Sequence, residues 1–262
     1  MSSPATSARA RRIDYQVHRA MVWCGLPLMV FTAGGLTLAG LLPVPVGADW
    51  SSERLVEFYG GHPTSLRAGL ILATIGLALL GPLTAVIATQ VRRLPYAPAA
   101  LATVQQMGGT LVIVVTVLPM IIMNTAAFRP DRDPAIIMAI NDFGWLLFIT
   151  PISLFFLQEL PIAVAILLDD SDDPLFPRWV GYVNIFVPLS FLPALLPYFV
   201  KSGPVAWHGV LTFYLGFITF GVWVFVMMWA SLRALRRSAN LAPFDSGHAL
   251  PESRSSTTTH AD

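Results

Sequence analysis

The chain has 262 residues, of which 55% are hydrophobic and 12% are charged, and its mean hydropathy is +0.66. A soluble globular protein carries about twice that charged fraction, so the composition excludes a soluble domain, a disordered chain and a nucleic-acid-binding protein. The net charge of +1 gives no general attraction to polyanions, and the single cysteine, Cys24, excludes an internal disulfide and a cysteine-based metal site. We therefore expect an all-α, polytopic membrane helix bundle, with the lipid bilayer as its main partner.

Six stretches reach the roughly 20 mainly apolar residues that a spanning helix needs. These predicted spans are residues 20–42, 68–91, 101–127, 134–168, 179–200 and 206–232. The first exceeds the core of a signal peptide and lacks a good cleavage site, so we interpret it as an uncleaved span. Together they predict one transmembrane domain, residues 20–232. The flanking segments are residues 1–19 and the tail 233–262, which is basic at first and then polar. Residues 1–19 and 238–262 have too few apolar residues for stable folding and are expected to be disordered.

The basic residues predict the orientation of the bundle. Eleven of the 16 lie on the side of the membrane that carries both termini. The other five are Arg54, Arg67, Arg129, Arg132 and Lys201. Because the side richer in basic residues is cytoplasmic, we expect both termini in the cytoplasm and the loop 43–67 outside.

The outer loop 43–67 carries the pattern of a short helix. Ser51 is a good N-cap, Glu53 lies in the first turn, and Gly60 and Gly61 end the pattern. The apolar side chains at positions 55, 56, 58 and 59 would lie largely on one side. This is typical of a helix on the membrane surface or over the end of a bundle. Its role stays open between simple packing and a lid over an entrance.

The fourth span contains the two acidic residues that fall inside the membrane. Glu159 lies nine residues before Leu168, about 14 Å along a helix, and therefore near the middle of the bilayer. Gln158 precedes it, and Pro161 frees the carbonyl of Leu157. Ionisable groups at this depth are costly and indicate function by default. The cluster is either a proton- or cation-binding point or a neutral glutamate that bonds a neighbouring helix.

Asn141 and Asp142 form a second polar point, near the outer end of the same span. Asn141 precedes Glu159 by eighteen residues, a whole number of turns, so an unkinked helix would place the two on one face. Asp142 is about 26 Å from Glu159 along the helix, which is too far for a paired acid–base site. The alternative role for Asp142 is an ion pair with Arg129 or Arg132.

The fifth span predicts an interrupted helix beside a third polar residue, Asn184. Pro188 frees the carbonyl of Asn184, and Pro193 and Pro197 follow on the same span. Broken helices line the binding sites of several transporter folds. The candidate intramembrane polar site therefore consists of Glu159, Gln158, Asn141, Asp142 and Asn184.

Motifs for catalysis, metals and nucleotides are missing from the sequence. The five histidines have no paired helical spacing that would ligate a metal or haem, and there is no nucleophile elbow, P-loop or dinucleotide fingerprint. We assign no catalytic, cofactor-binding or metal-ligating residue and expect no cofactor. His62 and His208 fall on the outer side, where the alternatives are an interfacial role or a surface metal site with Asp49 or Glu57.

Three segments of the chain resemble a set of six-span membrane proteins from actinobacteria for which no activity is established. The segments are residues 129–134 (RPDRDP), 141–145 (NDFGW) and 176–182 (FPRWVGY). The resemblance covers residues 11–237 and implies six spans in the cytoplasmic membrane. It transfers no catalytic or binding residue.

Three functions remain open at this point. The first is a small-molecule or proton/ion-coupled carrier centred on Glu159, which would explain an unpaired acid at mid-bilayer depth. The second is a non-catalytic scaffold or accessory subunit that binds a protein partner. The third, an enzyme acting on a lipid-soluble substrate, has the least support because no nucleophile–base pair or metal set is visible. Gly35 and Ala39 allow close helix approach, either inside the bundle or in a homo-oligomer.

Overall fold

The protein is an all-helical, multi-pass membrane protein. The computed structural model describes residues 4–240, with side chains for residues 9–237, and contains no strand in that range. Six segments there are long and apolar enough to cross a membrane: Arg9–Leu38, Pro63–Val91, Ala99–Phe128, Pro134–Leu168, Arg178–Tyr198 and Val210–Arg237. They overlap the six predicted spans, so the predicted fold class and span count are confirmed. The last helix continues to Asn240, so the expected disorder of the C-terminal tail is wrong for residues 238–240, and residues 241–262 lie outside the described residues.

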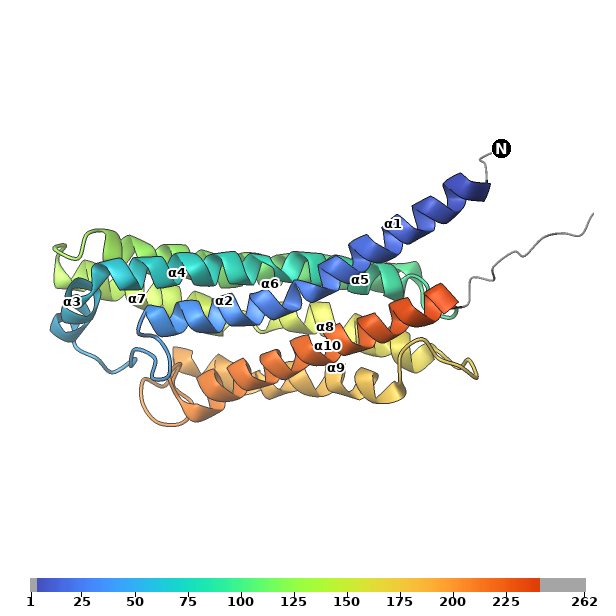
Figure 1. Cartoon of the computed structure of the whole chain (residues 1–262). Helices are drawn as coiled ribbons and strands as arrows, with labels where there is room; N and C mark the ends of the chain where they lie inside the picture. Colours follow the sequence, from blue (N-terminus) through green and yellow to red (C-terminus); the bar gives the residue numbers. More distant parts are fainter. Residues whose placement is uncertain (1–3, 241–262) are drawn as a thin grey trace, which may run out of the picture.

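The spans lie side by side in an elongated bundle with two distinct ends (Figure 1). Both described ends of the chain lie at one end, which we call the terminal end. The opposite end, which we call the loop end, carries α3 (Ser52–Gly61). As predicted, Ser51 caps α3 by accepting a hydrogen bond from the Arg54 amide, and Leu55 and Tyr59 are its buried residues.

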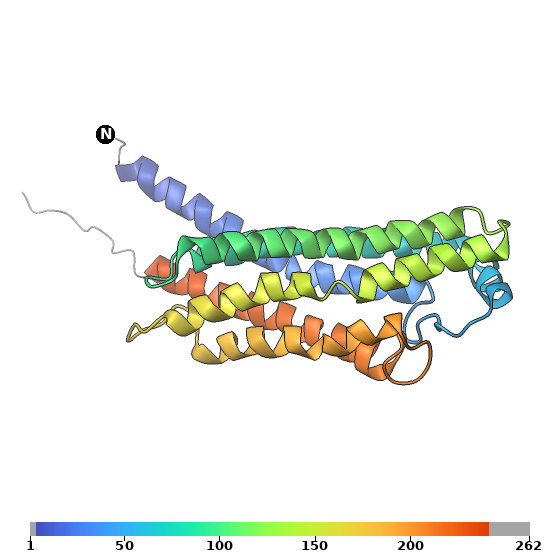
Figure 2. The same ribbon diagram turned by 180° about the vertical axis from the view of Figure 1, so that it is seen from behind.

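Five of the six spans are built from two helical pieces each. The pieces are α1 (Pro4–Trp23) with α2 (Gly25–Leu38), α4 (Pro63–Ala78) with α5 (Leu80–Val91), α7 (Pro134–Ile149) with α8 (Ser153–Leu168), α9 (Arg178–Ser190) with the 3-10 helix η1 (Leu192–Tyr198), and the π-helix η2 (Val210–Tyr214) with α10 (Leu215–Asn240). The third span, α6 (Ala99–Phe128), is continuous. Figure 2 shows the unbroken α6 beside the irregular link between α7 and α8.

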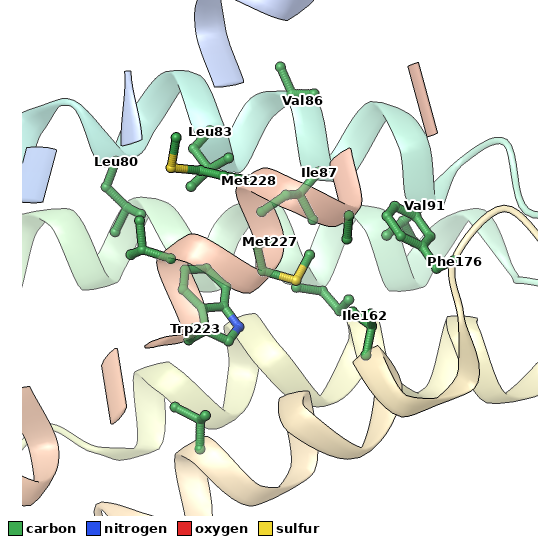
Figure 3. Close-up of a cluster of buried hydrophobic side chains, with 14 of the residues drawn as sticks. Leu80, Leu83, Val86, Ile87, Val91, Ile162, Phe176, Trp223, Met227 and Met228 are labelled. Atoms are coloured by element: carbon green, nitrogen blue, oxygen red, sulfur yellow. The ribbon is translucent and has the colours of Figure 1, made fainter. Parts of the chain in front are cut away.

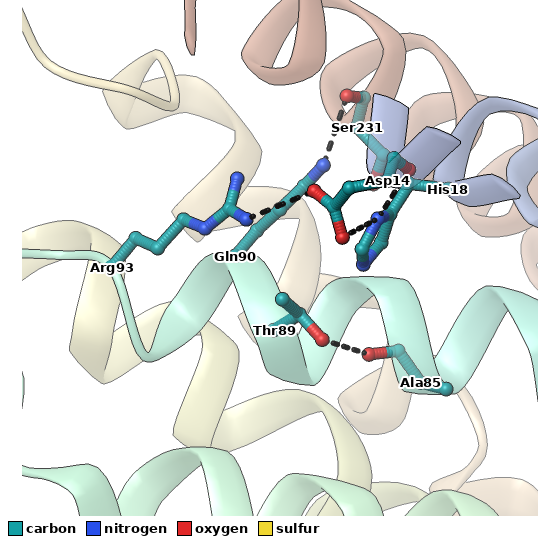
Figure 4. Close-up of polar contacts among 7 residues, drawn as sticks. All are labelled: Asp14, His18, Ala85, Thr89, Gln90, Arg93 and Ser231. Carbon is teal, nitrogen blue, oxygen red and sulfur yellow. Dashed lines mark hydrogen bonds and ion pairs between the residues drawn. The ribbon is translucent and has the colours of Figure 1, made fainter. Parts of the chain in front are cut away.

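The N-terminal segment differs from the expected disorder. α1 begins at Pro4, so the prediction of an unstructured segment is wrong for residues 4–19. Alanine and arginine, which are abundant there, are good helix formers. The helix is also tied to the bundle, because a carboxyl oxygen of Asp14 lies 3.8 Å from Nη2 of Arg93, just after α5 (Figure 4). Within α1, Asp14 also lies 3.2 Å from His18 Nδ1.

Small residues bring α2 and α4 into backbone contact. A Cβ atom added at Gly35 would lie 2.5 Å from the amide nitrogen of Ala73, and one added at Gly69 would lie 2.4 Å from the amide nitrogen of Ala39. Only hydrogen fits at either position. The close approach suggested by Gly35 and Ala39 is therefore made inside the bundle.

Buried apolar side chains form two separate clusters. The terminal-end cluster draws on α5, α8, α9 and α10, and Figure 3 shows part of it. Its labelled members include Leu83, Ile87, Ile162, Trp223 and Met227. The loop-end cluster is built around α2, α3, α4 and the far end of α6, with Tyr59 and Trp145 among its largest side chains. The breaks in α4/α5 and α7/α8 fall where one cluster gives way to the other.

Candidate functional site

A cavity of about 90 Å³ lies where four of the helix breaks come together. The breaks are those between α4 and α5, α7 and α8, α9 and η1, and η2 and α10. Its aromatic lining consists of Phe148, Phe155, Phe191, Phe213, Phe217 and Phe220. Three hydroxyl groups, those of Thr32, Thr116 and Thr212, also line it. The interrupted spans thus leave a partly open cavity with a largely aromatic lining.

Proline accounts for three of these four breaks. Pro82 lies four residues after Ala78 and cannot donate to its carbonyl, so the helix is interrupted between α4 and α5. Pro151 follows Thr150 and has no N–H to donate to the carbonyl of Leu147, four residues before it. Pro188 and Pro193 flank Phe191, where α9 gives way to η1. Proline cannot donate the backbone hydrogen bond that a continuous helix requires. The predicted interruption of the fifth span is confirmed.

Glu159 lies one helical turn from the aromatic lining. It follows Phe155 by four residues on α8, and residues four apart share a helix face. The Phe155 ring packs edge-on against Phe191 and Phe220, with centroids 4.9 and 6.1 Å apart. Glu159 is fully buried, and neither carboxyl oxygen has a hydrogen-bond partner among the described residues. The predicted intramembrane acid is therefore a carboxyl without a protein partner among the described residues; Glu159 lies one helical turn from the lining residue Phe155 and does not itself line the cavity.

The helices packed against α8 supply no countercharge to Glu159. α5 and α6 carry no titratable side chain. α9 carries only Arg178 and Tyr182, and both are exposed. An unpaired charge is strongly disfavoured in hydrocarbon. Without a countercharge from the protein, the Glu159 carboxyl has to be protonated or has to bind a cation or a water molecule that reaches it.

Gln158 lies at the closest contact between α6 and α8. A Cβ atom added at Gly108 would be 2.5 Å from the Gln158 amide nitrogen, so the two backbones touch. A Cβ atom added at Gly109 would be 2.9 Å from Thr84 Oγ1 and 3.2 Å from Gln158 Nε2, so both polar atoms lie beside this glycine. Neither Thr84 Oγ1 nor Gln158 Nε2 has a hydrogen-bond partner among the described residues. Gln105, one turn away on α6, is also fully buried without a partner. Unpaired polar groups therefore come from three helices.

Asn184 is fully occupied by protein contacts. Its amide nitrogen donates to the Val180 carbonyl at 2.8 Å and lies 3.4 Å from Sδ of Met227. Its amide oxygen accepts from the Trp223 indole at 2.9 Å. Since both ends of the amide are bonded, Asn184 joins α9 to α10 and has no free group for a ligand.

Asn141 and Asp142 lie at the loop end, away from Glu159. The break at Thr150–Ile152 separates α7 from α8, so the unkinked helix that would align Asn141 with Glu159 does not form. The Tyr59 hydroxyl donates to Asn141 Oδ1 at 3.1 Å, and the Asn141 amide donates to Asp142 at 3.3 Å. These contacts hold α3 against α7.

The expected ion pair between Asp142 and an arginine is not formed. Arg132 donates to the Thr125 carbonyl instead, and Asp142 interacts electrostatically with Lys201. Arg129 lies over the Phe128 ring. His208, whose role was open, accepts a hydrogen bond from the Ala48 amide and so joins the segment just before the last span to the loop 43–67.

Tyr59→Phe is expected to loosen α3 without unfolding the bundle. Burial, and after it the negative charge of Asp142, raises the pKa of the Tyr59 hydroxyl, so the group stays protonated and donates to Asn141. Losing that bond should cost about 1 kcal/mol. Hydrogen exchange should show faster exchange in α3, whereas Tyr182→Phe, at an exposed tyrosine, should leave it unchanged. Unaltered exchange in Tyr59→Phe would mean that apolar packing alone holds α3.

Reasoning from the sequence missed the aromatic cavity and the part played by Thr84. The adjacent glycines Gly108 and Gly109 were the available signal, because two small residues on one helix indicate a close neighbour. Comparisons with protein-family models, curated proteins and solved structures found no match to this chain. Its function is therefore argued from the geometry of the site.

Proposed function

We propose that this protein is a proton-coupled carrier of a small molecule, with Glu159 as its proton-binding group and the adjacent cavity as its cargo site. The observation that carries the proposal is a fully buried, unpartnered carboxyl one helical turn from a cavity. A carboxyl that bonded a neighbouring helix would be a structural group, as Asn184 is. Glu159 makes no such bond among the described residues.

The helix breaks support movement around this site. A helix interrupted next to a cavity can change its angle there without breaking hydrogen bonds in the rest of the span, and transporters of several folds use such discontinuous helices. Four spans are interrupted beside the cavity. In our proposal, the loop-end pieces move relative to the terminal-end pieces, and this movement exposes Glu159 and the cavity to one side of the membrane at a time.

We also propose that the terminal end faces the cytoplasm and that the membrane is the cytoplasmic one. The support is the excess of basic residues at the end of the bundle that carries both termini, since basic loops are retained inside. In this orientation α3 covers the outer end of the bundle.

Glu159→Gln should abolish coupled proton movement. Glutamine keeps the size of the side chain but cannot exchange a proton. The assay uses proteoliposomes with an imposed pH gradient, to which small organic solutes are added in turn, and a pH-sensitive dye reports collapse of the gradient. Native protein should respond to at least one solute and Glu159→Gln to none. Glu57→Gln makes the same change at an exposed position on α3 and should behave like the native protein.

Two results would contradict the carrier. One is a Glu159→Gln protein that responds to solutes as the native protein does. The other is a native protein that responds to no solute and purifies from mild detergent with a stoichiometric protein partner. The second result would favour the accessory-subunit function.

A further inference from the structure

We propose that the cargo is a small apolar organic cation, held by the phenylalanine faces of the cavity and neutralised by Glu159. This inference rests on the proposed function, because it takes the cavity as the cargo site. It adds the charge, size and chemical class of the molecule that the carrier exchanges for a proton.

The cavity lining favours a positive charge that carries apolar substituents. The face of an aromatic ring is negative, and cations bind there most strongly when water is excluded. Phe155, Phe191 and Phe220 belong to one cluster of aromatic contacts on this wall. The only polar lining groups are threonine hydroxyls, and no arginine or lysine lines the cavity to hold an anion. The lining therefore suits methyl or alkyl groups around a cationic centre.

Glu159 provides the charge that selects a cation over a neutral molecule. A neutral apolar cargo would be bound by the phenylalanines alone and would leave the carboxyl with no part in its recognition. A cation in the cavity would instead be attracted to the carboxylate of Glu159, which follows the lining residue Phe155 by one turn but does not itself line the cavity. Protonated Glu159 and the pair of Glu159 with a monovalent cation have the same net charge, namely zero. Release of one proton for each cation bound therefore keeps the site neutral in both states.

The elements packed around Glu159 offer no second group that could exchange a proton for the cation. Among the elements packed on α8, α5 and α6 carry no titratable side chain, and those of α9 are the exposed Arg178 and Tyr182. α10 contributes arginines only at its terminal-end turns, with Arg233 ten residues beyond Trp223. Cation binding should therefore compete with one proton and weaken as the pH is lowered.

The volume limits the size of the cation. The cavity of about 90 Å³ is smaller than the engineered cavity of about 150 Å³ that accommodates benzene. A tetramethylammonium ion is a suitable probe, because it has a permanent charge, an apolar surface and few atoms. Neopentane has the same shape without the charge and serves as its matched neutral control.

The test measures binding of radiolabelled tetramethylammonium to the full-length protein in detergent. We expect saturable binding that weakens as the pH falls, releases one proton per cation and is not displaced by neopentane. Glu159→Gln should weaken binding by at least about tenfold. Gly216→Leu should do the same by filling the cavity, since a Cβ atom there would lie 3.7 Å from the Phe191 ring and meet no closer atom. Gly34→Leu, where a Cβ atom would meet nothing within 4 Å, should leave binding unchanged.

Several results would overturn the inference. These are equal displacement by neopentane, unchanged binding in Glu159→Gln, or equal losses in Gly216→Leu and Gly34→Leu. If tetramethylammonium fails to bind while a neutral solute still drives proton exchange through Glu159, the cargo class is wrong and the carrier function stands. If the cation binds with proton release but never crosses a proteoliposome membrane, the carrier function itself is wrong.

Discussion

Gly69→Leu is expected to prevent correct assembly of the bundle. At this position α2 and α4 touch through their backbones, and an added Cβ atom would lie 2.4 Å from both the Ala39 nitrogen and the Gly35 oxygen. Backbone atoms cannot rotate aside as a side chain can, so the helices would have to separate. Overpacking of this kind costs about 3 kcal/mol or more, which is a large part of the stability of a marginally stable protein.

The measurement is thermal unfolding in detergent together with size-exclusion chromatography. Gly69→Leu should unfold at a much lower temperature or elute as an aggregate. Gly34→Leu adds the same side chain to α2 at an exposed position and should elute and unfold like the native protein. If Gly69→Leu were as stable as Gly34→Leu, the tight contact between α2 and α4 would be incorrect.

Glu159→Met, in contrast, is expected to make the protein more stable. The carboxyl is fully buried without a hydrogen bond among the described residues, so folding removes it from water without a replacement. Methionine has a similar length and carries no such penalty. The expected gain is about 1–3 kcal/mol, the usual cost of a buried unsatisfied polar group. It should appear as a higher midpoint of thermal unfolding, with proton exchange lost.

Asn184→Met is the matched comparison, because Asn184 is equally buried and all its polar groups are bonded. That substitution leaves the Trp223 indole without an acceptor and should lower the midpoint. A higher unfolding midpoint in Glu159→Met together with a lower one in Asn184→Met would indicate that Glu159 is retained for function and Asn184 for stability. A lower midpoint in Glu159→Met would mean that the carboxyl has a stabilising partner in the folded protein.

Features specified by neighbouring residues could be predicted from the sequence. The six spans follow from stretches of apolar residues, and the cap and buried side of α3 follow from Ser51 and the spacing of Leu55 and Tyr59. The break near Phe191 follows from the surrounding prolines. Each of these depends on contacts within one segment of the chain.

Features that depend on distant segments could not be predicted in the same way. Asn184 and Glu159 are both polar residues in apolar spans, and only the position of Trp223 on another helix distinguishes them. The alignment of Asn141 with Glu159 failed because Pro151 interrupts the helix between them. The break after Ala78 could have been predicted from Pro82, four residues later, by the same argument as the break near Phe191. The π-helix η2 has no proline within it, and α1 was missed because its composition resembles that of a soluble, unstructured segment.

The division of the buried side chains into two clusters has a consequence for how the protein unfolds. Each half of the bundle has its own apolar interior, and among the described helices only α2 and α6 contribute buried side chains to both without a break. Regions with separate interiors commonly open as separate cooperative units. Heating or denaturant should therefore melt the loop-end half, with α3, at a lower threshold than the half stabilised around Trp223, and an intermediate with one ordered half should accumulate between the two transitions.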